Sequence, residues 1–509
     1  MYVHTCHTMR RAEQALFDSG AVSSAQLMEI AIEQAAAQLS LDAEFCDAAR
    51  RFPLAVVYAG KGKNAGDAIG LARAMGFQRI ILRSPIATAD FAPETQAQLE
   101  RLDRGSLVLS PELPPLPPTG ALLIDGLLGS GACGELRSEY AALVEEMNRV
   151  RAEHAYCCTL AVDIPTGLSA DVGVVHKTIV QADATLAIGC VKPGMLADGA
   201  EDYVGRLICV PLPDVPLPES AEQVTDASSD TWTPRRAYSD YKNKMGRVRI
   251  VAGSLGYTGA AHMCAEAALA AGAGLVELCC LPSIYPLLAS RVAAEVMVRP
   301  VSSFREVSAA GADALLIGPG LGTPDAQDIE ALQQLVETAP CPLVLDADGL
   351  NLAAAHGWKL PPQAILTPHP GEMRRLFPEG ASMSRAACAA AFIRRQATPC
   401  TLLLKGARSI ITDGVRTYYN STGGPYMANG GQGDVLSGVI AAGAARGLEP
   451  LQAAARGAYL CGRAATRARV HRGYPEAVSA TQLLPYLTAL YEADPAASGA
   501  APAPREPKF

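Results

Sequence analysis

The chain has 509 residues and a formal net charge of −8, with 43 Lys and Arg against 51 Asp and Glu. Hydrophobic residues make up 49% and charged residues 18%, which excludes a mainly disordered chain. The acidic balance, without a run of Lys or Arg, argues against a general nucleic-acid or membrane-surface binder, and no apolar stretch is long enough to predict a membrane-spanning helix.

Cysteine usage indicates the cellular compartment. The 14 cysteines are scattered along the chain, and none forms a CxxC pair. Such thiols are typical of a reduced, cytoplasmic protein in which cysteine serves as a small apolar residue. Residues 1–14 also lack the apolar run of a secretory signal. We therefore expect a cytoplasmic protein without disulfides or a zinc site.

Composition divides the chain into two large domains. Pro, Ser, Asp and Thr dominate residues 211–241, and no apolar period survives there, which indicates a linker. An Ala- and Pro-rich tail begins near residue 493. We predict a first domain over residues 1–218, a linker over 219–240, a second domain over 241–492 and a disordered tail over 493–509.

Both domains alternate short apolar runs with helical patterns, which predicts an α/β fold with mostly parallel sheets. In the first domain the expected strands cover residues 54–60, 79–84, 106–110, 121–129, 159–165, 184–189 and 206–212. In the second they cover residues 247–254, 274–281, 312–320, 342–348, 364–369 and 401–406. Because ligands of open α/β sheets bind beyond the carboxyl ends of the strands, we expect the functional residues in the loops that follow them.

A glycine-rich turn follows the first strand. Gly60, Gly62 and Gly66 are spaced as GxGxxxG before a helical pattern, which indicates either a cradle for an anion or a tight turn. A dinucleotide-binding dehydrogenase should carry Asp or Glu at the end of its second strand. This chain has Arg83 and Ser84 there, which argues against an ordinary NAD dehydrogenase.

Polar residues follow three further strands of the first domain. Asp125 and Asp163 each end a strand and precede a glycine turn, and Lys192 follows another strand. Each Asp alone could be a turn former. Two carboxylates, the amide of Asn64 and the hydroxyl of Thr166 at one sheet edge would suit a monovalent or divalent cation that prefers oxygen ligands.

These motifs resemble the epimerase domain of the bifunctional NAD(P)H-hydrate repair enzymes. The matching segments are GKGKNAGD (60–67), DGLLGSG (125–131), VDIPTGL (162–168) and VKPG (191–194), although the family's first loop is typically NNGGDG and this chain has KNAGDA. The resemblance implies a Rossmann-like αβα sandwich, a catalytic role for Asp163, and K⁺ held by Asn64, Asp125 and Thr166. The hydrate site that it implies is lined by Lys63, Asn64, Ala65, Gly66, Asp67, Gly129, Ser130, Gly131, Ala132, Cys133, Gly134, Glu135 and Asp163.

A second glycine-rich turn lies near the end of the chain. Gly430, Gly431 and Gly433 precede a helical pattern, and glycines at a helix N-terminus form an anion hole from backbone N–H groups. Asp434 lies inside this turn. Its carboxylate could accept a proton from a hydroxyl while the N–H groups hold a phosphoryl group, or it could simply favour the helix dipole.

Two further strand ends of the second domain carry candidate residues. Lys405 precedes a glycine turn, where an ammonium group suits nucleotide phosphate, although a solvated strand-end lysine is the alternative. His369 is fixed between two prolines, which makes it a better ligand candidate than most single histidines. Asp346, Asp348 and Asn351 supply polar groups that could position a metal ion or water.

This half resembles the ribokinase-like dehydratase domain of the same family over nearly all of residues 241–470. The matching segments are NKMGRV (243–248), AGSLGYTGAA (252–261), IGPGLG (317–322), LDADGLN (345–351), LTPHPGE (366–372), LKGA (404–407) and GGQGDVLSG (430–438). One departure is Gln432, where the family usually has Thr or Ser.

The resemblance implies repair of hydrated nicotinamide cofactor. ADP, favoured over ATP by the fused layout, or ATP would phosphorylate the ring hydroxyl in the presence of Mg²⁺, and loss of phosphate would restore the reduced cofactor. The first domain would interconvert the two epimers so that both are repaired. Asp434 is the implied catalytic residue, and the implied hydrate contacts are Ala261, Gly320, Gly322, His369 and Asp434. The implied nucleotide contacts are Lys405, Gly406, Ala407, Arg408, Ser409 and Gly433.

Two other hypotheses stay open. A ribokinase-like kinase for a small molecule such as a vitamin precursor shares the GxGD turn, and the first domain could be a non-catalytic binding module because its KNAGDA loop is altered. In every case the expected partners are small molecules rather than nucleic acid or membrane. Association into a homo-oligomer is compatible with the sequence.

Overall fold

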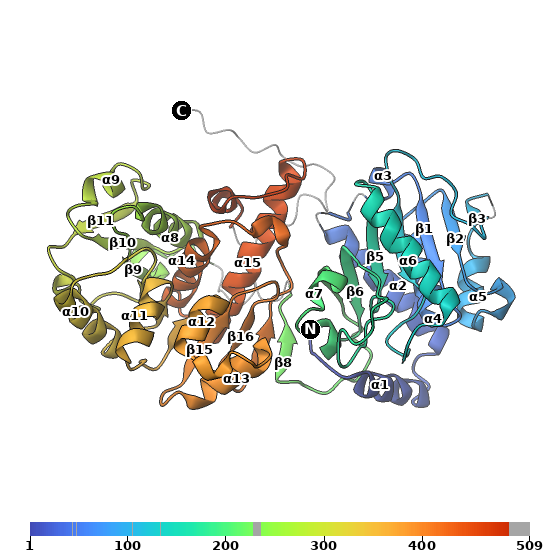
Figure 1. Cartoon of the computed structure of the whole chain (residues 1–509), viewed down its shortest axis with the longest axis horizontal. Helices are drawn as coiled ribbons and strands as arrows, with labels where there is room; N and C mark the ends of the chain where they lie inside the picture. Colours follow the sequence, from blue (N-terminus) through green and yellow to red (C-terminus); the bar gives the residue numbers. More distant parts are fainter. Residues whose placement is uncertain (43, 47, 104, 133, 227–235, 488–509) are drawn as a thin grey trace. The chain divides into compact units, whose positions relative to one another are not determined.

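The computed structural model describes residues 1–487 except 43, 47, 104, 133 and 227–235. Contacts divide the described chain into a first unit, Met1–Ser220, and a second unit that begins at Ala221 (Figure 1). The expected tail over residues 493–509 lies outside the described residues. Within the described part, no helix combines the length and the hydropathy needed to cross a bilayer.

The first unit is built on a seven-stranded sheet whose neighbouring strands all run parallel. The strand order is β3-β2-β1-β4-β5-β6-β7, so it reverses direction between β1 and β4. Such a reversal opens a crevice beyond the carboxyl ends of the strands, where ligands bind. The strands are β1 (Ala55–Ala59), β2 (Ile80–Arg83), β3 (Leu107–Leu109), β4 (Leu122–Gly126), β5 (Cys158–Val162), β6 (Ala184–Ile188) and β7 (Arg206–Val210).

Helices cover both faces of this sheet (Figure 1). Val57 and Ala59 of β1 belong to one buried cluster, and Val56 and Tyr58 to another, because successive side chains of a strand point to opposite faces. Helices α1, α2 and α4 pack into the first cluster and α6 into the second. The helices are α1 (Cys6–Asp18), α2 (Ser24–Leu41), α3 (Ala48–Arg51), α4 (Lys63–Ala74), α5 (Pro93–Glu100), α6 (Ser138–Glu153) and α7 (Glu201–Val204).

The second unit contains a ten-stranded sheet of order β11-β10-β9-β12-β13-β14-β15-β16-β17-β8. The strands from β11 to β15 run parallel, β16 is antiparallel to both neighbours, and β8 runs parallel to β17. The order reverses between β9 and β12. The strands are β8 (Glu222–Val224), β9 (Arg247–Val251), β10 (Leu275–Cys280), β11 (Val296–Pro300), β12 (Ala314–Ile317), β13 (Leu343–Leu345), β14 (Ala364–Leu366), β15 (Cys400–Leu404), β16 (Ile410–Thr412) and β17 (Thr417–Tyr419).

Helices α8, α14 and α15 form the apolar core of the second unit together with the sheet. Small residues let α8 and α14 approach closely, since a Cβ at Gly438 would lie 2.3 Å from the carbonyl oxygen of Cys264. The helices are α8 (Thr258–Ala270), α9 (Tyr285–Ala289), α10 (Ala326–Glu337), α11 (Asp348–His356), α12 (Pro370–Leu376), α13 (Arg385–Arg395), α14 (Gln432–Ala445) and α15 (Pro450–His471).

Every strand expected from the sequence is present, with bounds that differ by a few residues. Strands β8, β11, β16 and β17 were not expected, and three of them have only three residues, too few to show a period. Strand β8 lies inside the range expected to be a linker, 219–240. That range therefore contributes to the second sheet, because Glu222 to Val224 pair with Thr417 to Tyr419.

Candidate active sites

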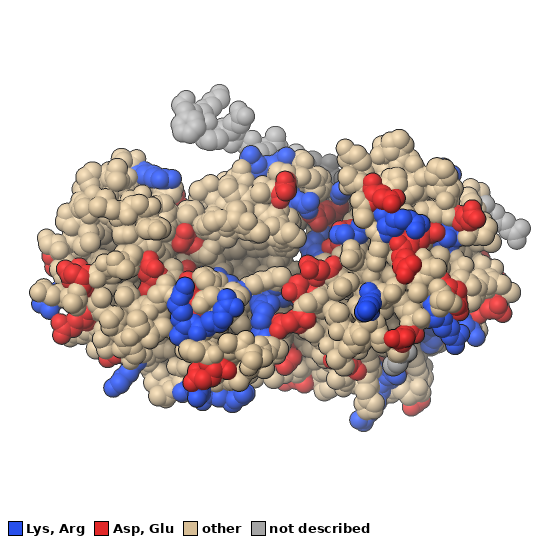
Figure 2. Space-filling model, viewed as in Figure 1, with Lys and Arg blue, Asp and Glu red and all other residues tan. Residues whose placement is uncertain are grey.

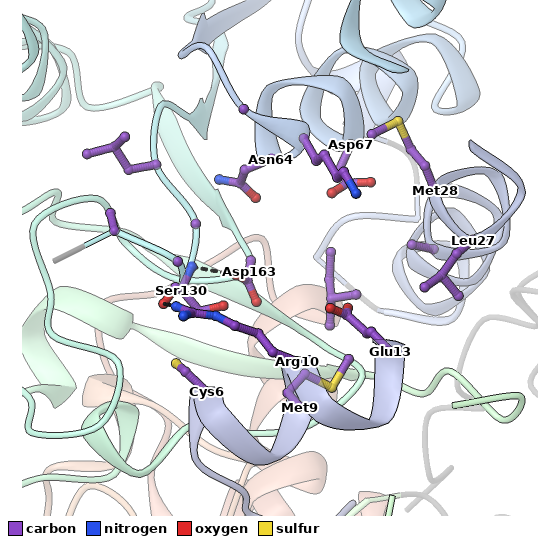
Figure 3. A pocket seen from close by; sticks show the side chains of 18 of the residues that line it. Cys6, Met9, Arg10, Glu13, Leu27, Met28, Asn64, Asp67, Ser130 and Asp163 are labelled. Atoms are coloured by element: carbon purple, nitrogen blue, oxygen red, sulfur yellow. Dashed lines mark hydrogen bonds between the residues drawn. The ribbon is translucent and has the colours of Figure 1, made fainter. Parts of the chain in front are cut away.

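A cavity of about 510 Å³ lies beyond the carboxyl ends of the central strands of the first unit (Figure 3). Asn64 and Asp67 enter it from the first turns of α4, and Ser130 comes from the loop after β4. Asp163 follows β5, and Lys192 follows β6. Helices α1 and α2 form the remaining walls, so the cavity lies where the topology predicts a ligand site.

Asp163 is held rigidly in this cavity. Its φ is 66°, in the left-handed region that Asp tolerates better than most residues. Its Oδ1 accepts a hydrogen bond from Lys192 Nζ at 2.5 Å, and its Oδ2 accepts one from the backbone N–H of Ser130 at 2.7 Å. Burial alone would raise the pKa of Asp163, but the buried ammonium of Lys192 holds that pKa below its ordinary value. Asp163 is therefore an ionised carboxylate that can accept a proton.

The polar side chains predicted to hold a cation fit that role. The side-chain oxygen and nitrogen of Asn64 are buried without a hydrogen-bond partner. Asp125 is fully buried and accepts hydrogen bonds of 2.8 Å from both the backbone N–H and the hydroxyl of Thr166. Burial raises the pKa of Asp125 to about 6, although the bonds from Thr166 lower it. A buried carboxylate and an unpartnered amide oxygen are donors suited to a cation with oxygen ligands.

The cavity contains part of the predicted hydrate site. The predicted residues that border it are Lys63, Asn64, Asp67, Gly129, Ser130, Gly131, Ala132 and Asp163. Ala65 and Gly66 are buried in α4, where a Cβ at Gly66 would lie 2.7 Å from Cε of Met28. Gly134 and Glu135 do not border the cavity, and Cys133 lies outside the described residues.

Sequence reasoning missed the contribution of α1 and α2. The lining residues of these helices are Cys6, Met9, Arg10, Glu13, Phe17, Ser24, Leu27, Met28 and Ala31. Both helices precede the first strand and carry no motif. Their helical spacing indicates which face is turned inward, but it cannot indicate that this face meets a cavity instead of the core. Lys192 was noticed only as a strand-end lysine.

The candidate site of the second unit is at the start of α14. Gly431 precedes this helix with a φ of 89°, a conformation that glycine adopts at no steric cost. Asp434 lies in the first turn, and its pKa is raised to about 6 by burial and by the charge of Asp346, against the opposing effect of Lys405. A carboxyl group with such a pKa can act as a proton acceptor near neutral pH.

Lys405 lies against the same helix start. Its Nζ is 2.7 Å from Oδ1 of Asp346 and 4.0 Å from Oε2 of Glu372. A Cβ at Gly433 would lie 3.2 Å from this Nζ. Burial would lower the pKa of Lys405, but Asp346 and Glu372 raise it above its ordinary value. A permanent positive charge therefore adjoins the N–H groups that begin α14, as a site for a phosphoryl group requires.

Of the residues predicted to bind nucleotide, 405–409 form one turn after β15, whereas Gly433 lies in the first turn of α14. Arg385 donates hydrogen bonds to the carbonyl oxygens of Lys405 and Arg408, at 3.4 and 3.2 Å. The hydroxyl of Ser409 donates to the carbonyl oxygen of Gly406 at 3.4 Å. Sequence reasoning did not find Arg385, because it reaches this turn from α13.

The residues predicted to contact the hydrate in the second unit differ in accessibility. Gly320 and Gly322 lie in a loop after β12 with positive φ values of 61° and 67°, and the hydroxyl of Ser254 donates to the carbonyl oxygen of Gly320 at 2.8 Å. Ala261 is fully buried in α8, so its side chain is unavailable to a ligand.

His369 has a structural role in addition to any ligand contact. It is the N-cap of α12, where its Nδ1 accepts hydrogen bonds from the backbone N–H groups of Gly371 and Glu372 at 2.9 and 3.3 Å. Its Nε2 lies 3.3 Å from Oε1 of Glu372. About half of the side chain, 52%, remains exposed, so the ring still presents a surface to a ligand.

Positive side chains gather on one part of the second unit. In the face that Figure 2 shows, Lys and Arg cluster over α12, whose last turn carries the exposed Arg374 and Arg375. The first turn of the same helix holds Glu372, next to Lys405. Such a cluster attracts anionic ligands such as nucleotides.

Two family models match the chain: the YjeF-related protein N-terminus over residues 24–194 and NAD(P)H-hydrate dehydratase over residues 248–489. The bifunctional NAD(P)H-hydrate repair enzyme Nnr of Coxiella burnetii is 33% identical over 500 residues, which cover 91% of this chain and 97% of that protein. The enzyme of the same name from Salinibacter ruber is 33% identical over 474 residues, covering 84% and 85%. A solved structure of an ADP/ATP-dependent NAD(P)H-hydrate dehydratase from Bacillus subtilis is 26% identical over 52% of this chain and 96% of that one, with a TM-score of 0.45. The chain belongs to the family of bifunctional NAD(P)H-hydrate repair enzymes.

Proposed function

We propose that this enzyme repairs hydrated nicotinamide cofactors, with the first unit interconverting the R and S epimers of the hydrate and the second unit dehydrating the S epimer. One observation carries the proposal for the second unit: Asp434 and the ammonium of Lys405 adjoin the glycine turn that begins α14. A proton acceptor beside an anion hole is what phosphoryl transfer to a hydroxyl requires.

In the second unit, Asp434 accepts the proton of the ring hydroxyl as the hydroxyl oxygen attacks the terminal phosphoryl group of ADP, which forms a phosphate ester and releases AMP. Lys405 and the N–H groups at the start of α14 stabilise the charge on the transferring group. The phosphorylated hydrate then loses phosphate and a proton from the neighbouring ring carbon, which restores the carbon–carbon double bond of the reduced cofactor. The turn over residues 405–409 binds the nucleotide, and Gly320, Gly322 and His369 contact the hydrate.

Mg²⁺ enters this proposal as a companion of the nucleotide. Among the described residues, no group of three or more His, Cys, Asp or Glu side chains is arranged to hold a metal ion. Mg²⁺ usually binds through substrate phosphates, waters and one or two carboxylates, so it does not require such a group. When bound, the ion would neutralise phosphate charge.

In the first unit, Asp163 is the proposed proton-transfer group, because its carboxylate is ionised and fixed at the cavity by Lys192 and Ser130. Lys63, Asn64, Asp67 and residues 129–132 form the surrounding contacts. Asn64, Asp125 and Thr166 would hold K⁺, which would supply a positive charge beside the hydrate. This role fits the unpartnered amide of Asn64 and the buried carboxylate of Asp125.

Removal of K⁺ is expected to slow epimerisation at least about tenfold, because the buried Asp125 would lack a counter-charge. Titration of K⁺ into the dialysed enzyme should restore the rate and should also slow hydrogen exchange in residues 62–68. In Asn64→Leu, half-activation should require a higher K⁺ concentration. Equal rates and equal exchange with and without K⁺ would contradict the cation site.

The proposed function is tested by following the absorbance of reduced nicotinamide after the enzyme is added to mixed-epimer NADH hydrate with Mg²⁺ and either ADP or ATP. Complete recovery, faster than spontaneous epimerisation allows, supports both activities. Recovery that stops at the S fraction supports the dehydratase alone. A stable phosphorylated product without reduced cofactor would instead identify a kinase.

Dehydration is expected to fail in acid. Because the pKa of Asp434 is raised to about 6, its carboxyl is increasingly protonated as the pH falls through that value and cannot then accept the hydroxyl proton. The kcat/KM for the S epimer should fall about tenfold for each pH unit below 6. Asp346→Asn removes a negative charge that raises the pKa of Asp434, so the midpoint of the acid limb of this variant's pH–rate profile should move to lower pH. A pH–rate profile of both proteins checks the shift, and an unchanged midpoint would contradict it.

A further inference from the structure

The carboxyl group of Glu13, on α1, faces the cavity of the first unit. Cys6, Met9, Arg10, Glu13 and Phe17 share the helix face that lines the cavity. Figure 3 shows the Glu13 side chain rising from α1 into the cavity. It is partly buried, and it forms no hydrogen bond or ion pair with any residue that the structure describes. A half-buried carboxyl that no protein group satisfies is a candidate for contact with a ligand.

The two other carboxyl groups of this cavity, those of Asp67 and Asp163, differ in their protein partners. Asp67 enters the same cavity from α4 and also lacks a hydrogen bond or ion pair within the described residues, whereas Asp163 is bonded to Lys192. Burial and the charge of Asp163 raise the pKa of Glu13, against the smaller opposing effects of Lys192, Lys63 and Arg10.

The pKa values of Asp67 and Asp163 are shifted in opposite directions. Burial and the charges of Asp163 and Glu13 raise the pKa of Asp67 well above its ordinary value, whereas Lys192 keeps Asp163 ionised. Carboxyl groups whose surroundings drive their pKa values apart are suited to opposite roles, one as acid and one as base.

Epimerisation of the hydrate needs both roles. Water adds to the dihydronicotinamide at the ring carbon next to nitrogen, because an enamine is protonated at its other alkene carbon. Inversion at that carbon can proceed by loss of the hydroxyl as water from one face and return of water to the other. An acid must therefore act on one face and a base on the opposite face.

We propose that Glu13, on the α1 wall of the cavity, is the second proton-transfer group of the epimerase site beside Asp163. The inference rests on the epimerase activity proposed above. In one direction protonated Glu13 gives its proton to the hydroxyl, the carbon–oxygen bond breaks, water leaves and the nitrogen lone pair forms a carbon–nitrogen double bond. A water molecule then bonds to the other face, its proton passes to the Asp163 carboxylate, and the double-bond electrons return to nitrogen.

The reverse direction uses the protonated Asp163 and the Glu13 carboxylate, and exchange with solvent resets both groups. α1 lies outside residues 24–194, which match the family's N-terminal model. In this proposal the helix supplies one of the two proton-transfer groups. Asp67, which faces the same space, would donate a hydrogen bond to the hydrate.

The test compares Glu13→Gln with the wild type, both as full-length enzymes. Chromatography follows the formation of R epimer from S hydrate in the absence of nucleotide. Glu13→Gln keeps the size of the side chain and cannot transfer a proton, so kcat should fall about 100-fold or more with KM within about threefold. Glu13→Asp should recover part of the rate. Glu33→Gln, which removes an exposed carboxyl of α2, is the matched control and should match the wild type.

A pH profile separates proton transfer from a merely structural role. The wild-type rate should fall on both the acid and alkaline sides, and Glu13→Gln should lose the alkaline limb. The groups that face Glu13 and could add to this profile are Cys6, Arg10, Lys63, Asp67, Asp163 and Lys192. Unchanged kcat and an unchanged profile, or a raised KM alone, would overturn the proposal.

The dehydratase in the same chain provides the internal control. Unchanged nucleotide-dependent dehydration of S hydrate by Glu13→Gln shows that the variant is folded and correctly quantified. If the wild type dehydrates S hydrate but does not form R epimer, the proposed epimerase activity fails, and the role of Glu13 fails with it. If the wild type epimerises and Glu13→Gln does so equally well, only the inference about Glu13 fails.

Discussion

Asp434→Asn is expected to reduce nucleotide-dependent dehydration about 10²–10⁴-fold, the contribution typical of a positioned proton acceptor. Asparagine fits the same position in the first turn of α14 but cannot take the hydroxyl proton. The loss should appear in kcat, because the glycine turn and Lys405 that adjoin the phosphoryl group are unchanged. The rate of reduced-cofactor formation from S hydrate and ADP measures it.

Two controls accompany this variant. ADP affinity, measured by calorimetry, should stay within a few-fold of the wild-type value, and R to S epimerisation without nucleotide should be unchanged. If Asp434→Asn kept more than about a tenth of the wild-type kcat, Asp434 would not be the proton acceptor.

Lys192→Met is expected to destabilise the first unit by about 3–5 kcal/mol, because it leaves the carboxylate of Asp163, whose side chain is only 17% exposed, without its cation. Lys192 is 1% exposed and lies in the protein interior at the end of β6, so water cannot easily replace the lost charge. Asp163→Asn with Lys192→Met removes both charges, and asparagine also tolerates the left-handed backbone at position 163. The double variant should therefore recover most of the stability.

Hydrogen exchange in peptides from β5 and β6 of the full-length protein reports these stabilities separately from the second unit. The double variant should be folded yet inactive as an epimerase, which distinguishes loss of the proton-transfer group from loss of structure. Equal stability of Lys192→Met and the wild type would show that the ion pair contributes nothing to the fold.

The sequence predicted the sheets well because strand periodicity and strand-end chemistry are local signals. Asp163 precedes a glycine turn and Asp434 follows one. The structure places Asp163 directly after β5 and Asp434 in the first turn of α14. The short strands β16 and β17 were missed because three residues carry no period, and β8 was missed because Pro and Ser surround it.

Site residues that come from elements far away in the sequence could not be predicted. Glu13 and Arg385 reach their sites from helices that carry no motif, and their sequence separations from Asp163 and Lys405 give no indication that they share a site. Asp346 was noticed as a strand-end carboxylate, but its hydrogen bond to Lys405 depends on the alignment of β13 with β15 through β14. Such alignments depend on the tertiary structure and cannot be predicted from local sequence patterns.

Strand β8 has a practical consequence for anyone who divides this chain. A fragment that starts at residue 241, where composition suggests the second domain begins, would lack the three residues that pair with β17. The freed N–H and C=O groups of β17 would then form an open sheet edge, which is a template for pairing between copies. Fragments that begin before Glu222 should keep this edge paired, and those that begin after Val224 should self-associate.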